Sequence, residues 1–375
     1  MHAVQVSFFV DPLGRTPRQL LRAWHSLVDI ATCATAAGVR MSVVQAHSCD
    51  EELTYRDIDF HFATSERRGK PLSRDIRFAR LLDELAPDVV HVHGLSFSRD
   101  VLALRHWQPD LPILLQDHAD RPPRWWRRRA WRRGIAAADG ISFCAQAQAS
   151  AFTSTGVIAP HLRIFEIPES TSFFTPGDRT VARAETGLRG DPCILWVGHL
   201  DANKDPLAVL DGVSEASALL PGLELWCCYG ASPLLGAVQA RISSDPRLRD
   251  RVHLLGRVPH ERIEALMRAA DLFVLGSHRE GSSFATIEAL ATGLTPVVTD
   301  IPSLRALVGE SGALWTPGDS ASLTAALLSV AGGDAESRRA RVREQFEREI
   351  AAPALGGKLR AAYATLIEER SHGPH

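Results

Sequence analysis

Membrane-spanning and cysteine-rich metal signatures are missing from this sequence. The six cysteines, at positions 33, 49, 144, 193, 227 and 228, show no C-x-x-C spacing, and a reduced cytosolic interior is the simplest account of them. The first apolar run, residues 4–10, is too short to cross a membrane and has no basic segment before it. We therefore expect a cytoplasmic protein with no targeting segment.

The sequence also lacks a charge excess and a complete dinucleotide fingerprint. A net charge of −2 over 375 residues argues against nucleic acid as a partner. Gly14 follows the first apolar run, but its loop lacks the further glycines of nicotinamide-binding proteins. No repeat is found at the residue level. Apolar content of 45% and charged content of 23% are typical of a soluble enzyme, and the length suggests two domains.

The first half of the chain alternates strands and helices. Residues 4–10 predict a strand, the loop of Gly14 follows, and apolar residues from Leu20 to Ala31 repeat at helical spacing. A second strand begins at Met41. This order is the entry to a Rossmann-like sheet, in which ligands bind outside the carboxyl ends of the strands, so we place Gly14 in the lining of a cleft.

Histidines mark the ends of two further strands. His91 and His93 fall on the same face of the strand at 88–93, because side chains alternate along a strand. The pair has the spacing of zinc ligands, but no third ligand is evident, so we expect a packed His91 and a His93 that lines the cleft. His118 directly follows the strand at 111–116, and we expect it to line the site.

Asp57 and Asp59 are a second candidate for a divalent-cation site in this half. Carboxylates at alternate positions suit such a cation, yet they equally suit the solvated face of an edge strand. Nothing nearby completes a coordination shell. We expect no metal.

The segment from Arg121 to Arg133 holds seven arginines and three tryptophans. It suits either a membrane-surface contact between Arg124 and Arg133, at the inner membrane surface, or a surface helix whose tryptophans pack inward. We favour the second interpretation, because a single basic helix on a neutral chain is common. Co-sedimentation with anionic liposomes distinguishes the two.

In the second half, Lys204 precedes a firm helix start. Asp205 is a good N-cap and Pro206 suits the first helical position. A lysine beside the free amides of a helix suits an anionic ligand, although a solvated loop lysine explains it equally well.

Residues 279–293 form the stretch around which this half is organised. A strand precedes it, a strand follows it, and Gly293 ends the helix between them. Gly281 allows close backbone approach, and Ser282 or Ser283 can cap the helix, whose N-terminus then binds an anion such as phosphate. Glu280 and Glu288 lie roughly 80° apart on a helical projection, so we expect separate duties on one ligand. A capped helix with solvated glutamates remains the alternative.

These halves predict an α/β protein of two Rossmann-like domains. The first domain is residues 1–175, completed by C-terminal helices at about 345–370, and the second is residues 188–340. The linker is best placed at residues 168–178, which are rich in proline, serine and threonine. A ligand is then expected in the cleft between the domains.

The chain resembles the family 4 glycosyltransferases of the two-domain GT-B architecture. The strongest similarity is the E-x7-E element from Glu280 to Glu288 with the intervening Gly-Ser-Ser-Phe. Also similar are the Gly-His-Leu segment at 198–200 with Lys204, the strand ending at His93, and the closing helices. Together, these elements extend over most of the chain.

The resemblance implies retaining transfer of a sugar from a nucleotide-diphosphate donor to an unknown acceptor, the hydroxyl of a glycan, a lipid-linked molecule or a small molecule, with no cofactor or metal. It implies that the donor binds to the second domain and that the acceptor meets the first. It implies that Lys204, His199 and the backbone of Gly281, Ser282, Ser283 and Phe284 hold the diphosphate. Glu280 would contact sugar hydroxyls, Glu288 the ribose, backbone near Arg257 the base, and His118 the donor sugar. The catalytic set implied is Glu280, Lys204 and His118.

The sequence departs from the family at two places. His199 stands where an arginine is usual, and Glu169-Ser170 replaces the usual Asn-Gly turn. Two other functions therefore stay open: a nucleotide-sugar binding protein that has lost catalysis, and a sugar-nucleotide epimerase on the same fold. Retention of Lys204, Glu280 and Glu288 argues against decay. Donor hydrolysis without acceptor separates these functions.

Overall fold

The computed structural model describes residues 1–64, 76–159 and 162–372. The chain forms two units. Unit 1 contains Met1–Thr171 and Ala352–His375, and unit 2 contains Ser172–Ala351. Each unit holds its own largely parallel sheet with helices on both faces, as the sequence predicts. The break between the units falls within the linker expected at residues 168–178.

The sheet of unit 1 has the order β3-β4-β2-β1-β5-β6-β7-β8. All neighbours are parallel except β3, which pairs antiparallel with β4. The order reverses direction between β1 and β5, so the loops after these two strands diverge and leave room for a ligand. The strands are β1 (His2–Ser7), β2 (Arg40–His47), β3 (Glu51–Tyr55), β4 (Ile58–Thr64), β5 (Val89–His93), β6 (Ile113–Gln116), β7 (Gly140–Phe143) and β8 (Arg163–Glu166).

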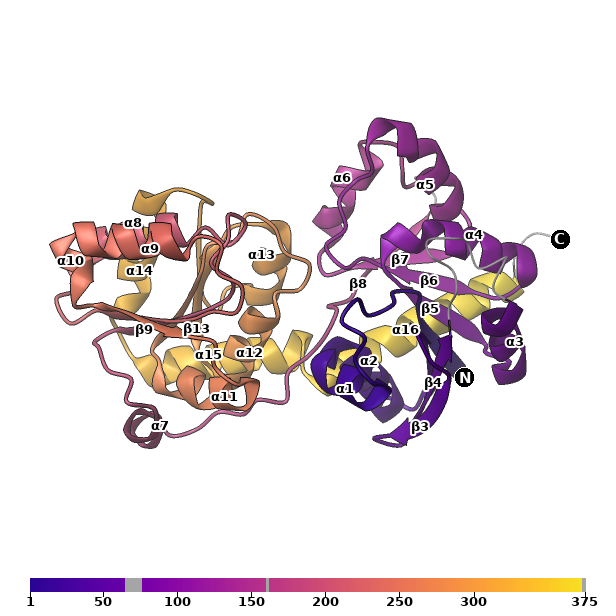
Figure 1. Ribbon diagram of the computed structural model, residues 1–375, viewed down its shortest axis with the longest axis horizontal. Helices are drawn as coiled ribbons and strands as arrows, with labels where there is room; N and C mark the ends of the chain where they lie inside the picture. The colour runs from indigo at the N-terminus through magenta and orange to yellow at the C-terminus, as the bar shows by residue number, and fades with distance from the viewer. Residues whose placement is uncertain (65–75, 160–161, 373–375) are drawn as a thin grey trace. The chain divides into compact units, whose positions relative to one another are not determined.

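Two helical layers cover this sheet (Figure 1). α1, α2 and α16 share one apolar core with the sheet, and α3, α4, α5 and α6 share the other. The helices are α1 (Pro17–Ala23), α2 (His25–Ala36), α3 (Ile76–Leu85), α4 (Ser98–Trp107), α5 (Arg128–Ile135), α6 (Ser150–Thr153) and α16 (Ala352–Ser371), with single 3-10 turns at η2 (Leu95–Phe97), η3 (Trp125–Arg127) and η4 (Gln146–Ala149).

The first strand and helix differ from their predicted forms. β1 ends at Ser7, and Phe9 and Val10 are exposed in the following loop. The single helix expected from Leu20 to Ala31 is two, because the backbone breaks at Trp24 with φ −110° and ψ 75°. The apolar spacing continues through the break, which is why periodicity alone does not show it.

The sheet of unit 2 is wholly parallel, in the order β11-β10-β9-β12-β13-β14. The chain runs outward from β9 to β11 on one side and from β12 to β14 on the other. The order therefore reverses between β9 and β12, and ligands of such sheets bind at this point. The strands are β9 (Cys193–Val197), β10 (Glu224–Cys228), β11 (Val252–Gly256), β12 (Leu272–Leu275), β13 (Thr295–Thr299) and β14 (Ala313–Trp315).

Helices lie on both faces of this second sheet (Figure 1). α8, α9, α10 and α14 gather on one face, and α11, α12, α13 and α15 on the other. The helices are α7 (Arg179–Thr186), α8 (Pro206–Ala216), α9 (Leu235–Ser244), α10 (Pro246–Arg249), α11 (His260–Ala269), α12 (Phe284–Thr292), α13 (Pro302–Val308), α14 (Ser320–Ala331) and α15 (Ala335–Glu349).

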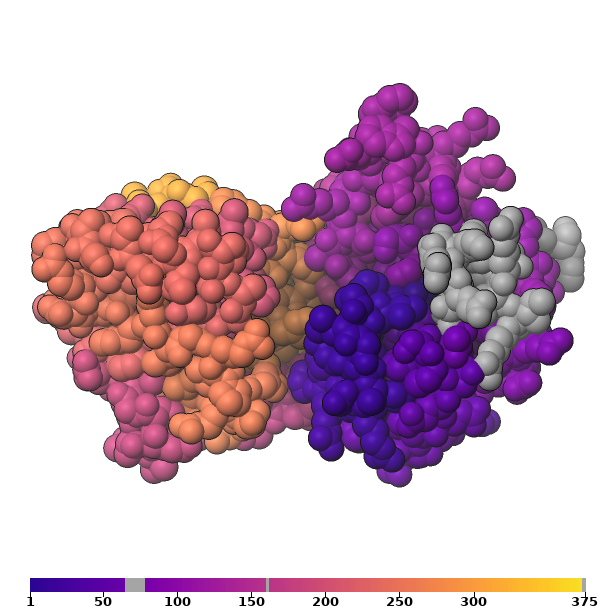
Figure 2. Space-filling model, viewed as in Figure 1, coloured from indigo at the N-terminus to yellow at the C-terminus, as the bar shows by residue number. Residues whose placement is uncertain are grey.

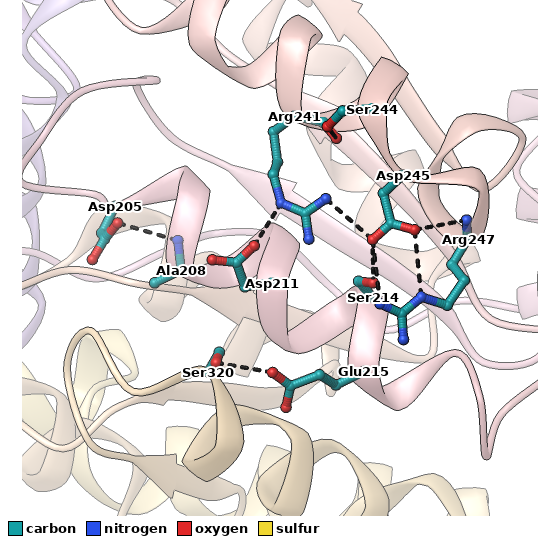
Figure 3. Close-up of polar contacts among 10 residues, drawn as sticks. All are labelled: Asp205, Ala208, Asp211, Ser214, Glu215, Arg241, Ser244, Asp245, Arg247 and Ser320. Atoms are coloured by element: carbon teal, nitrogen blue, oxygen red, sulfur yellow. Dashed lines mark hydrogen bonds and ion pairs between the residues drawn. The ribbon is translucent and has the colours of Figure 1, made fainter.

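A polar network ties α8 to its neighbours (Figure 3). Asp245 accepts hydrogen bonds from Ser214 Oγ at 2.6 Å and from Arg241 Nη1 at 3.1 Å, and Arg241 Nε also reaches Asp211 Oδ1 at 2.6 Å. The bond from Ser214, outweighing the effect of burial, holds the pKa of Asp245 below its usual value. The network fixes α8 against α9 and α10, and therefore fixes the loop that enters α8.

The two closing helices belong to different units. α15 packs on α12 in unit 2, where Phe346 is buried, whereas α16 packs on α2 in unit 1. The segment that completes unit 1 thus begins at Ala352 rather than at about residue 345. Of the helices in the described residues, none is both long and apolar enough to cross a membrane.

Candidate functional site

Two loops meet at the point where the order of the unit 2 sheet reverses. One follows β9 and carries Lys204, and the other follows β12 and carries Glu280. Lys204 Nζ forms an ion pair with Glu280 Oε1, and the two side chains are only 17% and 13% exposed. The fold thus brings together two residues that are 76 positions apart, a contact that the sequence alone does not predict.

The backbones of these loops are also joined. Asn203 Nδ2 donates to the carbonyl of Arg279 at 3.0 Å, and the amide of His278 donates to the carbonyl of Asn203 at 2.8 Å. Gly276 permits this approach, because a Cβ there would lie 2.7 Å from the carbonyl oxygen of Lys204. Lys204 is therefore held by the opposite loop before any ligand binds.

The helix start behind Lys204 has the predicted cap. The carboxylate of Asp205 accepts from the amide of Ala208 at 3.3 Å, and Pro206 occupies the first helical position. Asp205 has φ +49°, a left-handed conformation that asparagine and aspartate tolerate better than most residues. Its second oxygen pairs with His278 Nε2 at 2.9 Å, which again joins the two loops.

The start of α12 differs from its predicted form. Ser283 is the N-cap residue, but its side chain makes no capping hydrogen bond; its Oγ instead accepts from Thr286 Oγ1 at 2.9 Å. Ser283 therefore does not cap the first amides of α12 with its side chain. Uncapped amides at a helix N-terminus suit an anion. Gly281 and Ser282 are buried beside them and Phe284 is exposed.

Glu288 lies one turn into α12 and has a different partner from Glu280. Its Oε1 is 2.6 Å from Nε2 of His260, the first residue of α11. The two glutamates thus have separate partners, and their separate duties on a ligand stay a prediction. The sequence analysis did not identify His260, although its place just after the loop of Arg257 could have suggested it.

His199 and Arg257 lie at the same carboxyl edge of the sheet. His199 is exposed, just after β9, and its Nδ1 accepts from the amide of Ala231 at 3.0 Å. Arg257 is exposed directly after β11.

Unit 1 holds a chain of buried histidines. The stacked rings of His91 and His93 lie 4.6 Å apart, and His91 Nδ1 is 2.8 Å from the hydroxyl of Tyr363 in α16. His93 Nδ1 is 2.8 Å from His118 Nε2, and His118 Nδ1 is 2.9 Å from Glu169 Oε2. His91 is fully buried, as predicted. The sequence places Glu169 in the linker and does not predict its contact with His118.

The surroundings of His118 favour its protonated form. Burial opposes its charge, but the bond to Glu169 and the nearby carboxylates of Asp117 and Asp120 outweigh burial and raise its pKa. Burial, together with His91 and His118, lowers the pKa of His93 well below its usual value. Burial and two neighbouring carboxylates raise the pKa of Asp117 to about 7.

A cavity of about 430 Å³ opens beside these histidines, within unit 1. His93 and His118 line it, together with Phe9 from the loop after β1. Gly14, which the sequence places at a cleft, is exposed with φ +61° in that same loop and is not among the residues that line this cavity.

The carboxylate pair weighed as a metal site does not form a cluster. Asp57 has φ +60° in the turn between β3 and β4, and Asp59 accepts from Thr54 Oγ1 at 3.0 Å. Among the described residues, no group of three histidine, cysteine or carboxylate side chains could hold a metal ion.

The structure corrects the interpretation that the tryptophans of the arginine-rich segment all pack inward. Only Trp131 packs inward; Trp125 and Trp126 are 75% and 55% exposed and stand edge to face, with ring centroids 5.7 Å apart. Trp125 and Trp126 lie in η3, before α5 begins, and so are not on the face of α5 that packs inward. Figure 2 shows side chains of this part of unit 1 projecting into solvent.

Comparison with known proteins covers both halves of the chain. Residues 23–166 match the family described as Glycosyltransferase Family 4, and residues 191–332 match Glycosyl transferases group 1. A GDP-mannose:cellobiosyl-diphosphopolyprenol alpha-mannosyltransferase of Xanthomonas campestris is 27% identical over 60% of this chain and 59% of its own length. A D-inositol 3-phosphate glycosyltransferase of Nocardia farcinica is 30% identical over 44% of this chain and 39% of its own. The chain thus spans about three-fifths of these curated relatives or less.

Solved structures share the fold over nearly the whole chain. Sucrose-phosphate synthase from Thermosynechococcus elongatus has a TM-score of 0.71 at 18% identity, covering 98% of this chain and 100% of that one. Anabaena Alr3699/HepE in complex with UDP also has a TM-score of 0.71, at 15% identity, covering 97% and 100%. These likenesses confirm the predicted GT-B architecture, and together with the two family matches they show that the chain belongs to the family 4 (group 1) glycosyltransferases.

Proposed function

We propose that the protein transfers a sugar, with retention of configuration, from a nucleoside-diphosphate sugar to a hydroxyl acceptor. The observation that carries the proposal is the Lys204–Glu280 pair, held just before the N-terminus of α12 where the order of the unit 2 sheet reverses. A cation, free amides and a carboxylate are the groups that a sugar diphosphate needs.

The chemistry assigns separate duties to these groups. As the bond to the sugar breaks, the leaving diphosphate gains negative charge, and preorganised donors aimed at it lower the barrier. Lys204 and the amides of α12 supply those donors. Glu280 accepts hydrogen bonds from sugar hydroxyls, and a ligand that engages both partners replaces their mutual ion pair with two new contacts.

The remaining assignments follow the family resemblance. Glu288 accepts from the ribose, which requires His260 to share or release its carboxylate. Backbone near Arg257 contacts the base, and Gly281, Ser282, Ser283 and Phe284 contribute amides to the diphosphate. The role of His118 at the donor sugar remains a prediction, as does a metal-free reaction. Two similar proteins, the GDP-mannose-dependent mannosyltransferase of Xanthomonas campestris and Anabaena Alr3699/HepE in complex with UDP, support a nucleotide-sugar donor.

Release of nucleoside diphosphate without acceptor tests this function. The full chain is incubated with UDP- and GDP-sugars, and free UDP or GDP is measured. We expect slow release from one donor, and losses of about 100-fold or more in Lys204→Ala and Glu280→Ala, the size typical of a lost transition-state donor. Arg189→Ala is the control, because it breaks an ion pair with Glu224 at the opposite end of β10.

Calorimetry with UDP and GDP separates the two assigned roles. Lys204→Ala should weaken nucleoside diphosphate binding, whereas Glu280→Ala should leave it unchanged or tighter, because the freed lysine turns to the diphosphate. Unchanged release in both variants would refute the proposal. Donor binding without any release would indicate the binding-protein alternative, and conversion of the donor to its epimer the epimerase.

We also infer a cytoplasmic protein that contacts the inner membrane surface through η3 and α5. Two exposed tryptophans stand among exposed arginines at 121, 124, 127, 129, 132 and 133. Tryptophan rings favour the interface between water and lipid, and each arginine near an anionic surface contributes about 1 kcal/mol. The exposure of Trp125 and Trp126 supports this inference over the inward-packed alternative.

A further inference from the structure

The cavity of unit 1, the unit that we expect to meet the acceptor, is lined by aromatic side chains and a few polar groups. Phe9, Trp24 and Phe97 supply aromatic faces, and the rings of Phe9 and Trp24 lie 5.6 Å apart at 42°. Such rings stack on the apolar face of a sugar or cyclitol ring, and a few polar groups then fix its orientation. Here Ser7, Ser26, Ser96 and Asp120 also line the cavity.

The cavity provides no cation for a phosphate group. Of the described residues that line it, none is lysine or arginine. Proteins bind phosphate groups with such side chains, most precisely with the paired donors of arginine. Asp120 adds a carboxylate, fixed by the amide of Leu95 at 2.8 Å from its Oδ2. A phosphate placed here would meet like charge and no lysine or arginine to compensate it.

His118 does not supply the missing cation to a ligand, although its pKa is raised. Its Nδ1–H points to Glu169 Oε2 and its Nε2–H to His93 Nδ1. Both of its donors are therefore used inside the protein, and Glu169 neutralises its charge.

His93 offers the cavity a neutral donor. With His118 as the donor, which is the direction that its raised pKa favours, His93 Nδ1 accepts and the N–H of His93 lies on Nε2. This Nε2 is buried and has no hydrogen-bond partner among the described residues, and His93 lines the cavity. A buried N–H without a partner costs free energy that a ligand hydroxyl recovers.

We propose that this cavity takes an uncharged ring of a sugar or cyclitol as the acceptor and excludes one that is phosphorylated at the bound end. The inference rests on the proposed transferase function and adds the charge class of its acceptor. The aromatic faces hold the ring, His93 donates to one of its oxygens, and Asp120 accepts from a hydroxyl.

Binding and transfer are measured with matched pairs of probes. The full chain, saturated with UDP or GDP, is titrated with methyl β-glucoside against glucose 6-phosphate, and with myo-inositol against inositol 1-phosphate. We expect the neutral member of at least one pair to bind at least tenfold more tightly, since unpaired like charges are strongly disfavoured. The same preference should appear in kcat/KM for transfer.

Variants locate the effect in the cavity. Phe9→Ala should raise the acceptor KM roughly three- to tenfold by removing one stacking face, whereas Leu13→Ala, exposed in the same loop, should leave it unchanged. Ser96→Arg, on the exposed η2 turn, should reduce the preference by admitting the phosphorylated probes.

The outcomes separate the inference from the function on which it rests. Normal release of nucleoside diphosphate with preference for a phosphorylated probe, or with no neutral probe bound, overturns the inference alone. Absence of release and of nucleotide binding overturns the proposed function, and the acceptor titration without nucleotide then still decides the charge preference of the cavity.

Discussion

At the scale of single residues, His199 is the position where this chain departs from its family within the proposed diphosphate site. The ring is exposed, and its Nδ1 accepts a hydrogen bond from the amide of Ala231, which orders the loop after β10. Lys204 is then the cation at this edge that faces Glu280. The geometry thus explains how the site keeps its shape without the usual arginine, but not how it replaces the charge.

Replacing this histidine by arginine tests the missing charge. His199→Arg should tighten UDP or GDP binding by about tenfold, because a charge-assisted hydrogen bond contributes roughly 1.5–3 kcal/mol and the lost contact to Ala231 offsets part of it. Binding should also become more dependent on salt. Calorimetry at two ionic strengths measures both effects.

The neutral substitution His199→Asn is the matched control, and it should change affinity little. If His199→Arg instead weakens binding severely while His199→Asn does not, His199 serves the ligand or the loop by its shape and not as a substitute charge.

At the scale of elements, the sequence predicted those whose signal is local. The N-cap of Asp205, the stop at Gly293 with φ +75° and the buried strands all follow from short-range rules. The hydrogen bond of Ser283 to Thr286 and the backbone break at Trp24 do not, because each depends on three-dimensional packing that leaves the apolar spacing intact. The contact of Glu169 with His118 could not be predicted from local rules either, since 51 positions separate the two residues.

The segment of η3 and α5 carries the second element-scale prediction. The full chain should co-sediment with vesicles rich in anionic lipid at low salt, and should remain in solution with purely zwitterionic vesicles, because its arginines need a negative surface. The double variant Trp125→Ala with Trp126→Ala should lose most of this binding.

Trp107→Ala is the control for this experiment. Trp107 is 46% exposed on α4, away from the arginine cluster, and donates to Asp83 Oδ1 at 3.0 Å. Equal losses in both variants, or no binding of the unmodified chain with its fold intact, would contradict a specific membrane surface.

At the scale of the whole molecule, the chain leaves unit 1 at Thr171 and returns to it at Ala352. α16 then places Leu355, Leu359, Tyr363 and Leu366 in the core that it shares with α2, all fully buried. Unit 1 therefore depends on the last part of the sequence, whereas unit 2 is continuous from Ser172 to Ala351. The sequence predicts closing helices that complete the first domain from about residue 345, but α15 packs on α12 in unit 2. Periodicity marks the apolar positions of a helix without identifying the helix against which they pack.

This division predicts that one buried leucine of α16 sets the stability of unit 1 alone. Leu359→Ala should cost roughly 2–5 kcal/mol through lost burial and the cavity left behind. In scanning calorimetry, UDP or GDP should raise the transition temperature of unit 2, the unit proposed to bind it, by mass action. Leu359→Ala should lower only the transition temperature of unit 1. Glu368→Ala, exposed on the same helix, should lower neither. A shift of the nucleotide-responsive transition in Leu359→Ala would show that the two units unfold together, since a lesion confined to the core of unit 1 has no other route to unit 2.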